Sequence, residues 1–234
     1  MSERQIVLDT ETTGLSASDG HRIIEIGCVE MENRRLTGRT LHHYLNPERD
    51  IDEGAMQVHG LTLEMLADKP LFEQVADEFI EFVTGAEILI HNAAFDVGFL
   101  DAEFKRLRRK PLSQYCGEVT DTLAMARELH PGRRNSLDVL CDRYGVSNAH
   151  RKLHGALLDA ELLADVYLAM TRGQDSLEIV STASSQAAQV TLNGDWPPKN
   201  LRVLKASESE QTAHAEQLAE IAKDRGEPAL WPTP

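Results

Sequence analysis

Gln5-Ile6-Val7-Leu8-Asp9-Thr10-Glu11-Thr12-Thr13-Gly14, near the start of the chain, combines a short apolar run with two acids. The run Ile6 to Leu8 is typical of a buried strand. Residues two apart in a strand point to the same face, so Asp9 and Glu11 should lie close together on one side of a sheet. Carboxylates held that close repel each other unless a cation lies between them, and a divalent metal with oxygen ligands suits the position. By itself such a pair is more often the solvated end of a strand, so the metal interpretation needs support from other residues.

The chain has 234 residues and a formal net charge of −14. This length is enough for one sizeable core and an appendage. No stretch approaches the ~20 apolar residues that cross a bilayer, and the N-terminus has no apolar signal region, so we expect a cytoplasmic protein. The charge argues against binding nucleic acid through a broad basic surface, although carboxylates filled with metal are locally cationic toward phosphate.

The three cysteines, Cys28, Cys116 and Cys141, are widely spaced and odd in number, without metal-site spacing. They predict neither a disulfide framework nor a zinc site. Because Cys28 lies in an apolar run that resembles a strand, we expect it to be a buried, reduced thiol.

Basic residues gather in three short runs despite the acidic total: Lys105 to Lys110, Arg133-Arg134 and Arg151-Lys152. The first run is explained equally well by the solvated end of a helix, which favours cations at its C-terminus, or by contact with a nucleic-acid backbone. An exposed charge run does not decide between these two roles.

Apolar periodicity and chain breakers predict an α/β fold, a mixed sheet flanked by helices. After the first strand we expect strands at 22–30, 39–45, 87–91 and 119–122, with 31–38 as a hairpin connection. Short helices are expected within 51–65, and longer ones over 72–83, from 93 toward 110, after 122 through 129, over 137–144 and from 156 to near 172. Asn92 and Ser136 are the expected N-caps of two of these helices.

Three further residues can join Asp9 and Glu11 in one site. Asp96 and Asp159 fall in the first turns of two predicted helices, and His154 lies on the loop before the second, where it should be exposed. Hydrolysis of a phosphodiester needs an activated water and neutralisation of developing charge, which two metals bridged by a carboxylate supply. A histidine near neutral pKa can take the proton from that water. Taken singly, each residue is explained more simply as a helix-terminal, loop or solvated side chain.

Three motifs carry a family resemblance: Ile6-Val7-Leu8-Asp9-Thr10-Glu11-Thr12-Thr13-Gly14, His91-Asn92-Ala93-Ala94-Phe95-Asp96-Val97-Gly98-Phe99-Leu100 and His154-Gly155-Ala156-Leu157-Leu158-Asp159-Ala160. They resemble the exonuclease motifs of the DEDDh 3′–5′ exonucleases, and most of all those of the epsilon proofreading subunits of bacterial DNA polymerase III. The resemblance covers residues 4–173 and implies a ribonuclease-H-like mixed sheet. It also implies two-metal hydrolysis that releases nucleoside 5′-monophosphates from DNA 3′ ends.

The resemblance implies a role for each matching residue. Asp9 would bridge two divalent cations, Mg²⁺ or Mn²⁺, while Glu11 and Asp159 complete the site of the cation that activates water. Asp96 would serve the second cation through water, and His154 would be the general base. The residues implied to bind substrate are Asp9, Glu11, Thr12, His59, His91 and Asp159. For His59 and His91, a core or capping role remains the alternative.

The composition changes after the exonuclease domain, which we expect at residues 1–180. Residues 181–200 are rich in Ser, Ala, Gln and Thr and predict a flexible linker. Residues 201–234 predict a short helical tail that docks on the polymerase alpha subunit, with packing back on the nuclease domain as the alternative. Within 174–179, Gln174, Leu177 and Ile179 match the peptide by which bacterial replication proteins bind the sliding clamp, although so short a motif also arises by chance.

We therefore expect a metal-dependent 3′–5′ exonuclease that proofreads newly replicated DNA as a subunit of the bacterial replicative polymerase. Its expected partners are DNA 3′ ends, the alpha subunit and the sliding clamp, and the resemblance also allows a small third core subunit. One alternative is a nuclease of the same fold, of the RNase T or oligoribonuclease type, which would need no tail. The other is a non-catalytic scaffold between polymerase and clamp, which would not need all five site residues.

Overall fold

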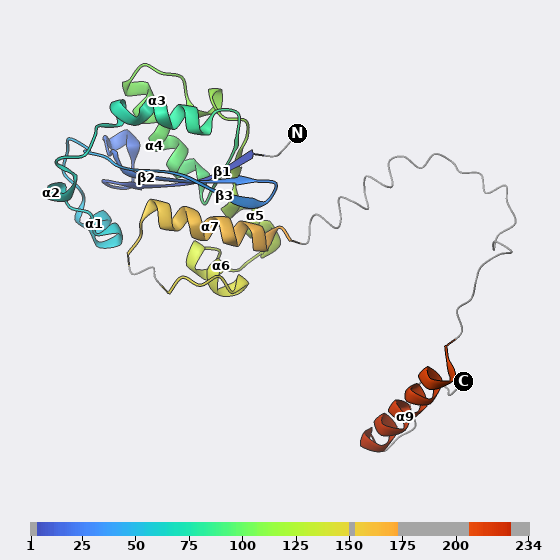
Figure 1. Ribbon diagram of the computed structural model, residues 1–234. Coiled ribbons are helices and arrows are strands. Elements are labelled where there is room, and N and C mark those ends of the chain that lie inside the picture. Colours follow the sequence, from blue (N-terminus) through green and yellow to red (C-terminus); the bar gives the residue numbers. More distant parts are fainter. Residues whose placement is uncertain (1–3, 150–152, 173–205, 226–234) are drawn as a thin grey trace, which may run out of the picture. The chain divides into compact units, whose positions relative to one another are not determined.

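A mixed sheet lies at the centre of the first of two units, Met1–Ala183, while Ser184–Pro234 form the second. The computed structural model describes residues 4–149, 153–172 and 206–225. Its strands are β1 (Arg4–Thr12), β2 (Ile23–Glu32), β3 (Arg35–Tyr44), β4 (Glu87–Ile90) and β5 (Val119–Asp121), in the order β3-β2-β1-β4-β5 (Figure 1). β1, β2 and β3 are antiparallel neighbours, whereas β4 and β5 continue the sheet in parallel with β1. The predicted mixed sheet is confirmed.

Helices cover both faces of this sheet (Figure 1). One face carries α3 (Phe72–Val83) and α4 (Ala93–Arg106), and the other carries α5 (Thr122–Leu129), α6 (Leu137–Tyr144) and α7 (Ala156–Met170). The short helices are η1 (Ala17–Asp19), α1 (Glu53–His59), α2 (Leu63–Leu66) and η2 (Leu112–Gln114).

The alternation of β1 divides its side chains between two cores. Ile6 and Leu8 pack into the core beneath α3 and α4, whereas Val7 packs into the core formed with α5, α6 and α7. Asp9 and Glu11 continue the series of Val7, so both carboxylates leave β1 on the α7 face. The same-face prediction for the two acids is therefore confirmed.

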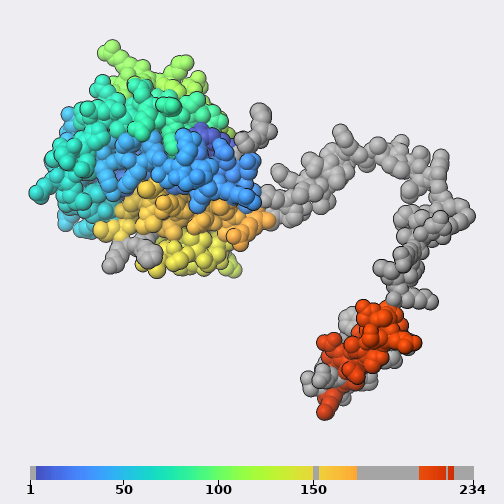
Figure 2. Space-filling model, in the orientation of Figure 1, coloured from blue at the N-terminus to red at the C-terminus, as the bar shows by residue number. Residues whose placement is uncertain are grey.

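Gly27 on β2 allows α7 to approach the sheet closely. Gly27 pairs with Asp9 across the ladder between β1 and β2, and a Cβ added at Gly27 would collide with the backbone of Ala156 and Leu157. Figure 2 shows the orange residues of α7 lying directly along the blue surface of the neighbouring strands. Because glycine has no side chain, the first turn of α7 can lie beside the segment that carries Asp9.

The hairpin connection predicted between the second and third strands is confirmed, but its bounds of 31–38 are wrong, because β2 and β3 continue to a tight turn at Asn33 and Arg34. Both turn residues have positive φ, 50° and 62°, which suits the twist of a two-residue hairpin. The Arg34 guanidinium donates to the carbonyl of Leu168 at 3.1 Å and to the hydroxyl of Thr171 at 2.7 Å. Long-range contact with the end of α7 thus supports a turn that is shorter than the polar composition of the segment indicated.

The predicted N-caps at Asn92 and Ser136 are only partly right. Both residues occupy N-cap positions, of α4 and α6, but neither side chain makes a capping hydrogen bond. Asn92 has φ 71° and ψ 53°, and its N–H donates to Asp121 Oδ1 at 3.2 Å. Asp121 also caps α5, so one carboxylate serves two neighbouring helix starts.

The helix predicted to run toward Lys110 ends at Arg106. Arg108 has φ 54°, which breaks the helix, and Arg109 pairs with Asp77 of α3. The solvated-helix-end interpretation of this basic run therefore applies only to Lys105 and Arg106. Cys28, by contrast, is buried and free, as predicted.

The second unit contains α9 (Glu208–Arg225) among its described residues. The short helix predicted within 201–234 is confirmed by α9, whereas the predicted linker at 181–200 lies outside the described residues. In the described parts of both units, no helix is long and apolar enough to cross a membrane.

Replacing Gly27 with alanine should destabilise the protein by about 1–3 kcal/mol, because the added Cβ displaces the backbone of α7. Thermal unfolding should show a clear fall in the melting temperature. Gly54→Ala is the matched control, since a Cβ there meets no atom within 4 Å. Equal melting temperatures for Gly27→Ala and the wild type would contradict the close-approach account.

Candidate active site

Two acids of the site stand at the C-terminal end of β1. Asp9 is half-buried and Glu11 is buried, and both lie on the face covered by α7. Their separation of two residues along the strand brings both carboxylates to one side, where the first turn of α7 also arrives.

Asp96 reaches the same end of β1 from the first turn of α4. The ladder between β1 and β4 pairs Gln5 to Val7, so β1 continues beyond its parallel neighbour. There the Asp96 carboxylate takes the place of a strand: its Oδ1 accepts from the Thr10 N–H at 3.0 Å and from the Thr10 hydroxyl at 2.6 Å. Burial raises the pKa of Asp96 to about 7, although the two bonds from Thr10 oppose this change.

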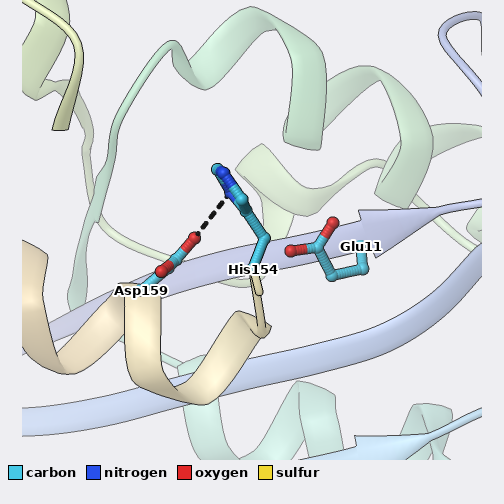
Figure 3. A group of neighbouring side chains, drawn as sticks. All are labelled: Glu11, His154 and Asp159. Carbon is cyan, nitrogen blue, oxygen red and sulfur yellow. Dashed lines mark ion pairs between the residues drawn. The ribbon is translucent and has the colours of Figure 1, made fainter. Parts of the chain in front are cut away.

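The first turn of α7 and the loop before it supply the remaining members of the group. Figure 3 shows Asp159 on α7, His154 just before that helix and Glu11 on β1 converging on one point. His154 Nδ1 lies 3.2 Å from Asp159 Oδ2, and one ligand atom from each of Glu11, His154 and Asp159 falls within 4.8 Å of the others. The His154 side chain is 43% exposed and that of Asp159 only 4%, so the exposure expected for the histidine is confirmed.

All five residues line one cavity of about 610 Å³, which also contains arginines, asparagines and His91. A second, more apolar cavity of about 440 Å³ lies next to it and shares Thr10, Glu11 and Phe95. The second cavity contains two of the predicted substrate-binding residues, Thr12 and His59. Its other lining residues include Ala55 and the exposed Leu15 and Val58. The structure thus brings the predicted catalytic, metal-binding and substrate-binding residues to these two neighbouring cavities.

His59 and His91 each combine a structural bond with an unsatisfied nitrogen. His59 Nδ1 accepts from the Leu61 N–H at 3.0 Å, so the neutral ring carries its proton on Nε2. The Thr122 hydroxyl donates to the Ile90 carbonyl at 3.2 Å, and His91 Nδ1 lies 3.1 Å from the same hydroxyl. Both Nε2 atoms are buried without a partner among the described residues, and burial lowers the pKa of both rings. A core or capping role alone leaves these atoms unexplained.

The donor set fits divalent cations. Asp9, Glu11, Asp96 and Asp159 present carboxylates to one cavity, and carboxylate oxygens are preferred ligands of hard divalent ions. A cation in the cavity would stabilise the ionised form of Asp96 and so oppose the rise of its pKa that burial causes. These residues could therefore hold metal without a change of fold.

Sequence reasoning missed several residues of the site. Thr10, which orients Asp96, and Phe95, which lies between the cavities, stand inside quoted motifs but received no role. Arg127 and Asn135 also line the larger cavity and lie outside those motifs. The predicted clamp residues Gln174, Leu177 and Ile179 lie outside the described residues.

Comparison of the sequence with known proteins indicates the family to which the chain belongs. Residues 6–167 match the family model described as an exonuclease of the RNase_T type. The chain is 52% identical to DNA polymerase III subunit epsilon of Pasteurella multocida over 238 residues, 97% of this chain and 93% of that one. It is 50% identical to DNA polymerase III subunit epsilon of Escherichia coli over 236 residues, 97% of each chain.

Solved structures agree on the fold. Exonuclease X, determined in complex with 5′ overhanging duplex DNA, matches with a TM-score of 0.57 and 25% identity, over 73% of this chain and 93% of that one. E. coli exonuclease I in complex with a dT13 oligonucleotide matches with a TM-score of 0.66 over 76% of this chain and 43% of that one. Its identity of 19% supports the fold alone.

Asp96→Asn should stabilise the metal-free protein more at about pH 7.5 than at about pH 5. An acid with pKa 3.8 when unfolded and about 7 when folded destabilises the folded state increasingly as pH rises between those values. One pKa unit corresponds to about 1.4 kcal/mol, so thermal unfolding in EDTA should detect the gain.

Asp165→Asn, an identical change at an exposed position of α7, should show no such pH-dependent gain. If the two substitutions shift the melting temperature alike at both pH values, the burial of Asp96 does not raise its pKa.

Proposed function

Because the chain belongs to the exonuclease family and, within it, to the DNA polymerase III epsilon subunits, we propose that it is the 3′–5′ exonuclease that proofreads newly replicated DNA in a bacterial replicative polymerase. The observation that carries the proposal is the meeting of the three sequence motifs in one cavity, where Asp9, Glu11, Asp96 and Asp159 lie together with His154. A scaffold protein would have no need for this arrangement of buried acids.

We assign the carboxylates to two divalent cations, Mg²⁺ or Mn²⁺. Asp9, a half-buried carboxylate on the same cavity as the other three acids, would bridge both. Glu11 and Asp159 would complete the site nearer His154, since their ligand atoms lie within 4.8 Å of one another and of the histidine. Asp96, held by Thr10, would serve the second cation through water. When bound, such cations activate water and neutralise charge on the phosphoryl oxygens.

His154 is assigned as the general base. Its ring is exposed to the cavity, and Asp159 holds Nδ1 at 3.2 Å, which restricts the ring to the neighbourhood of the acids. The imidazole takes the proton of the attacking water, the oxygen of that water bonds to phosphorus, and the 3′ oxygen of the preceding nucleotide leaves. The product is a nucleoside 5′-monophosphate.

The smaller cavity would hold the terminal nucleotide. It is more apolar than its neighbour, it shares Glu11 with the carboxylate cluster, and Thr12 and His59 line it. His59 Nε2–H, buried without a partner among the described residues, is a donor suited to an oxygen of the sugar or phosphate. His91 lines the larger cavity instead.

The remaining partners are assigned from the C-terminal part of the chain. We propose that residues 201–234, which include α9, bind the polymerase alpha subunit, and that 174–179 bind the sliding clamp. A small third core subunit would contact the nuclease domain. A replication subunit of this kind would act in the cytoplasm. The match to epsilon relatives over 97% of the chain supports carrying these roles over.

The direct test uses a primer labelled near its 3′ end and annealed to a template, with either a paired or a mismatched terminus, and a matched RNA primer. With Mg²⁺, the protein should release deoxynucleoside monophosphates, faster from the mismatched end because a frayed terminus enters the cavity more readily, and EDTA should stop release. Asp9→Ala should be inactive. Faster degradation of RNA than of DNA would favour an RNA-trimming enzyme instead, and full activity of Asp9→Ala would contradict the two-metal assignment.

His154→Ala should lower kcat by about 100-fold or more, since a general base contributes roughly 10²–10⁴-fold. The melting temperature should change little, because the side chain is 43% exposed. His43→Ala is the matched control: His43 pairs with the exposed Glu78, away from the cavity, and its loss should leave kcat unchanged. If His154→Ala retains the wild-type kcat, another group is the base.

A further inference from the structure

We propose that Arg127, Arg133 and Arg134 form a phosphate-binding wall that holds the DNA strand leading to the scissile bond. The wall lies on the larger cavity, together with the carboxylate cluster. This inference rests on the proposed exonuclease function and adds a binding surface that is separate from the cation ligands.

The location of the three arginines follows from the path of the chain. Arg127 lies in the last turn of α5, and Arg133 and Arg134 lie in the connection from α5 to α6. All three are exposed, and all three line the cavity that contains Asp9, Glu11 and Asp96. One cavity therefore contains a cluster of acids and, on different elements, a cluster of guanidinium groups.

Hydrogen bonds from the side chains of Asn135 and Arg143 hold the backbone of the connection between α5 and α6. Asn135 is buried, and its Nδ2 donates to the Arg133 carbonyl at 3.1 Å. Arg143 of α6 donates to Asn135 Oδ1 and to the Arg134 carbonyl, each at 2.8 Å. These bonds involve the backbone and the Asn135 side chain, and none of them uses the guanidinium group of residue 133 or 134. A wall held in this way loses little conformational entropy when a ligand binds.

The guanidinium groups lack carboxylate partners within the described part of the chain. No ion pair joins Arg127, Arg133 or Arg134 to an acid there, although Arg4, Arg22, Arg39 and Arg109 all have such pairs. Asp138 is the carboxylate nearest in sequence on the same cavity, and its Oδ1 accepts from Asn148 Nδ2 at 3.3 Å. Three cations without carboxylate partners are available for an anionic ligand.

The shape of the two cavities gives the direction of the strand. If the terminal nucleotide occupies the apolar cavity, its phosphodiester lies at Glu11, which both cavities share. The preceding nucleotides must then continue into the larger cavity, which is the one lined by the arginines. In a chain of net charge −14, such a local cluster is needed to offset the repulsion of a polyanion.

The test compares two substrates with the full-length protein in Mg²⁺. One is a single-stranded DNA oligonucleotide, and the other is the p-nitrophenyl ester of thymidine 5′-monophosphate, which has one phosphodiester and no preceding phosphates. In the combined variant Arg127→Gln, Arg133→Gln and Arg134→Gln, kcat/KM for DNA relative to kcat/KM for the ester should fall by about tenfold or more, mainly through KM.

The salt dependence gives a second readout. For single strands, each lost phosphate contact should reduce the slope of log(kcat/KM) against log salt by about 0.7. Lysine at the three positions keeps the charge and should restore most of the slope. Arg35→Gln, an exposed arginine at the start of β3 and at the other end of the sheet, is the control and should alter neither substrate.

The outcomes separate the two proposals. If the wild type hydrolyses both substrates and the glutamine variant keeps the same ratio and salt slope, the phosphate-binding wall is wrong while the exonuclease function stands. A wild-type protein that hydrolyses neither substrate would overturn the proposed function and the wall with it.

Discussion

The close packing of α7 on β2 at Gly27 is the contact on which the site depends. Asp9 pairs with Gly27 across the ladder, and the backbone of Ala156 and Leu157 occupies the space that a side chain at Gly27 would fill. The first turn of α7 is thereby placed at the end of β1. Asp159 therefore lies near Asp9 and Glu11, although almost the whole domain separates them in the sequence. A wider separation of helix and sheet would leave Asp9 and Glu11 as a solvated strand end.

Holding the acids together at the end of β1 lowers the stability of the folded protein. β1 extends beyond its pairing with β4, and the Asp96 carboxylate, rather than another strand, accepts the N–H of Thr10. Burying this acid raises its pKa to about 7, so part of the folding free energy is spent on keeping carboxylates together. Divalent cations would offset that cost, so the ions that the chemistry needs would also stabilise the folded protein.

Several polar side chains around the acids use some of their atoms in hydrogen bonds within the fold and leave other atoms for a ligand. His59 and His91 each use Nδ1 in a bond within the fold and keep Nε2 buried without a partner among the described residues. Asn135 and Arg143 likewise fix the backbone that carries Arg133 and Arg134. Rigid support of this kind positions groups before a ligand arrives, which lowers the cost of ordering them on binding.

The sequence by itself determined the mixed sheet, the same-face placement of Asp9 and Glu11, and the helix-start positions of Asp96 and Asp159, because strand alternation, helix periodicity and motif order are local properties. It did not determine the turn at Asn33 and Arg34, which the end of α7 supports, or the left-handed backbone of Asn92. Nor did it reveal the role of Gly27, the bond from Thr10 to Asp96, or the arginines on the cavity. Only the tertiary structure decided these features, because each depends on contact between segments far apart in the chain, about which local patterns carry no information.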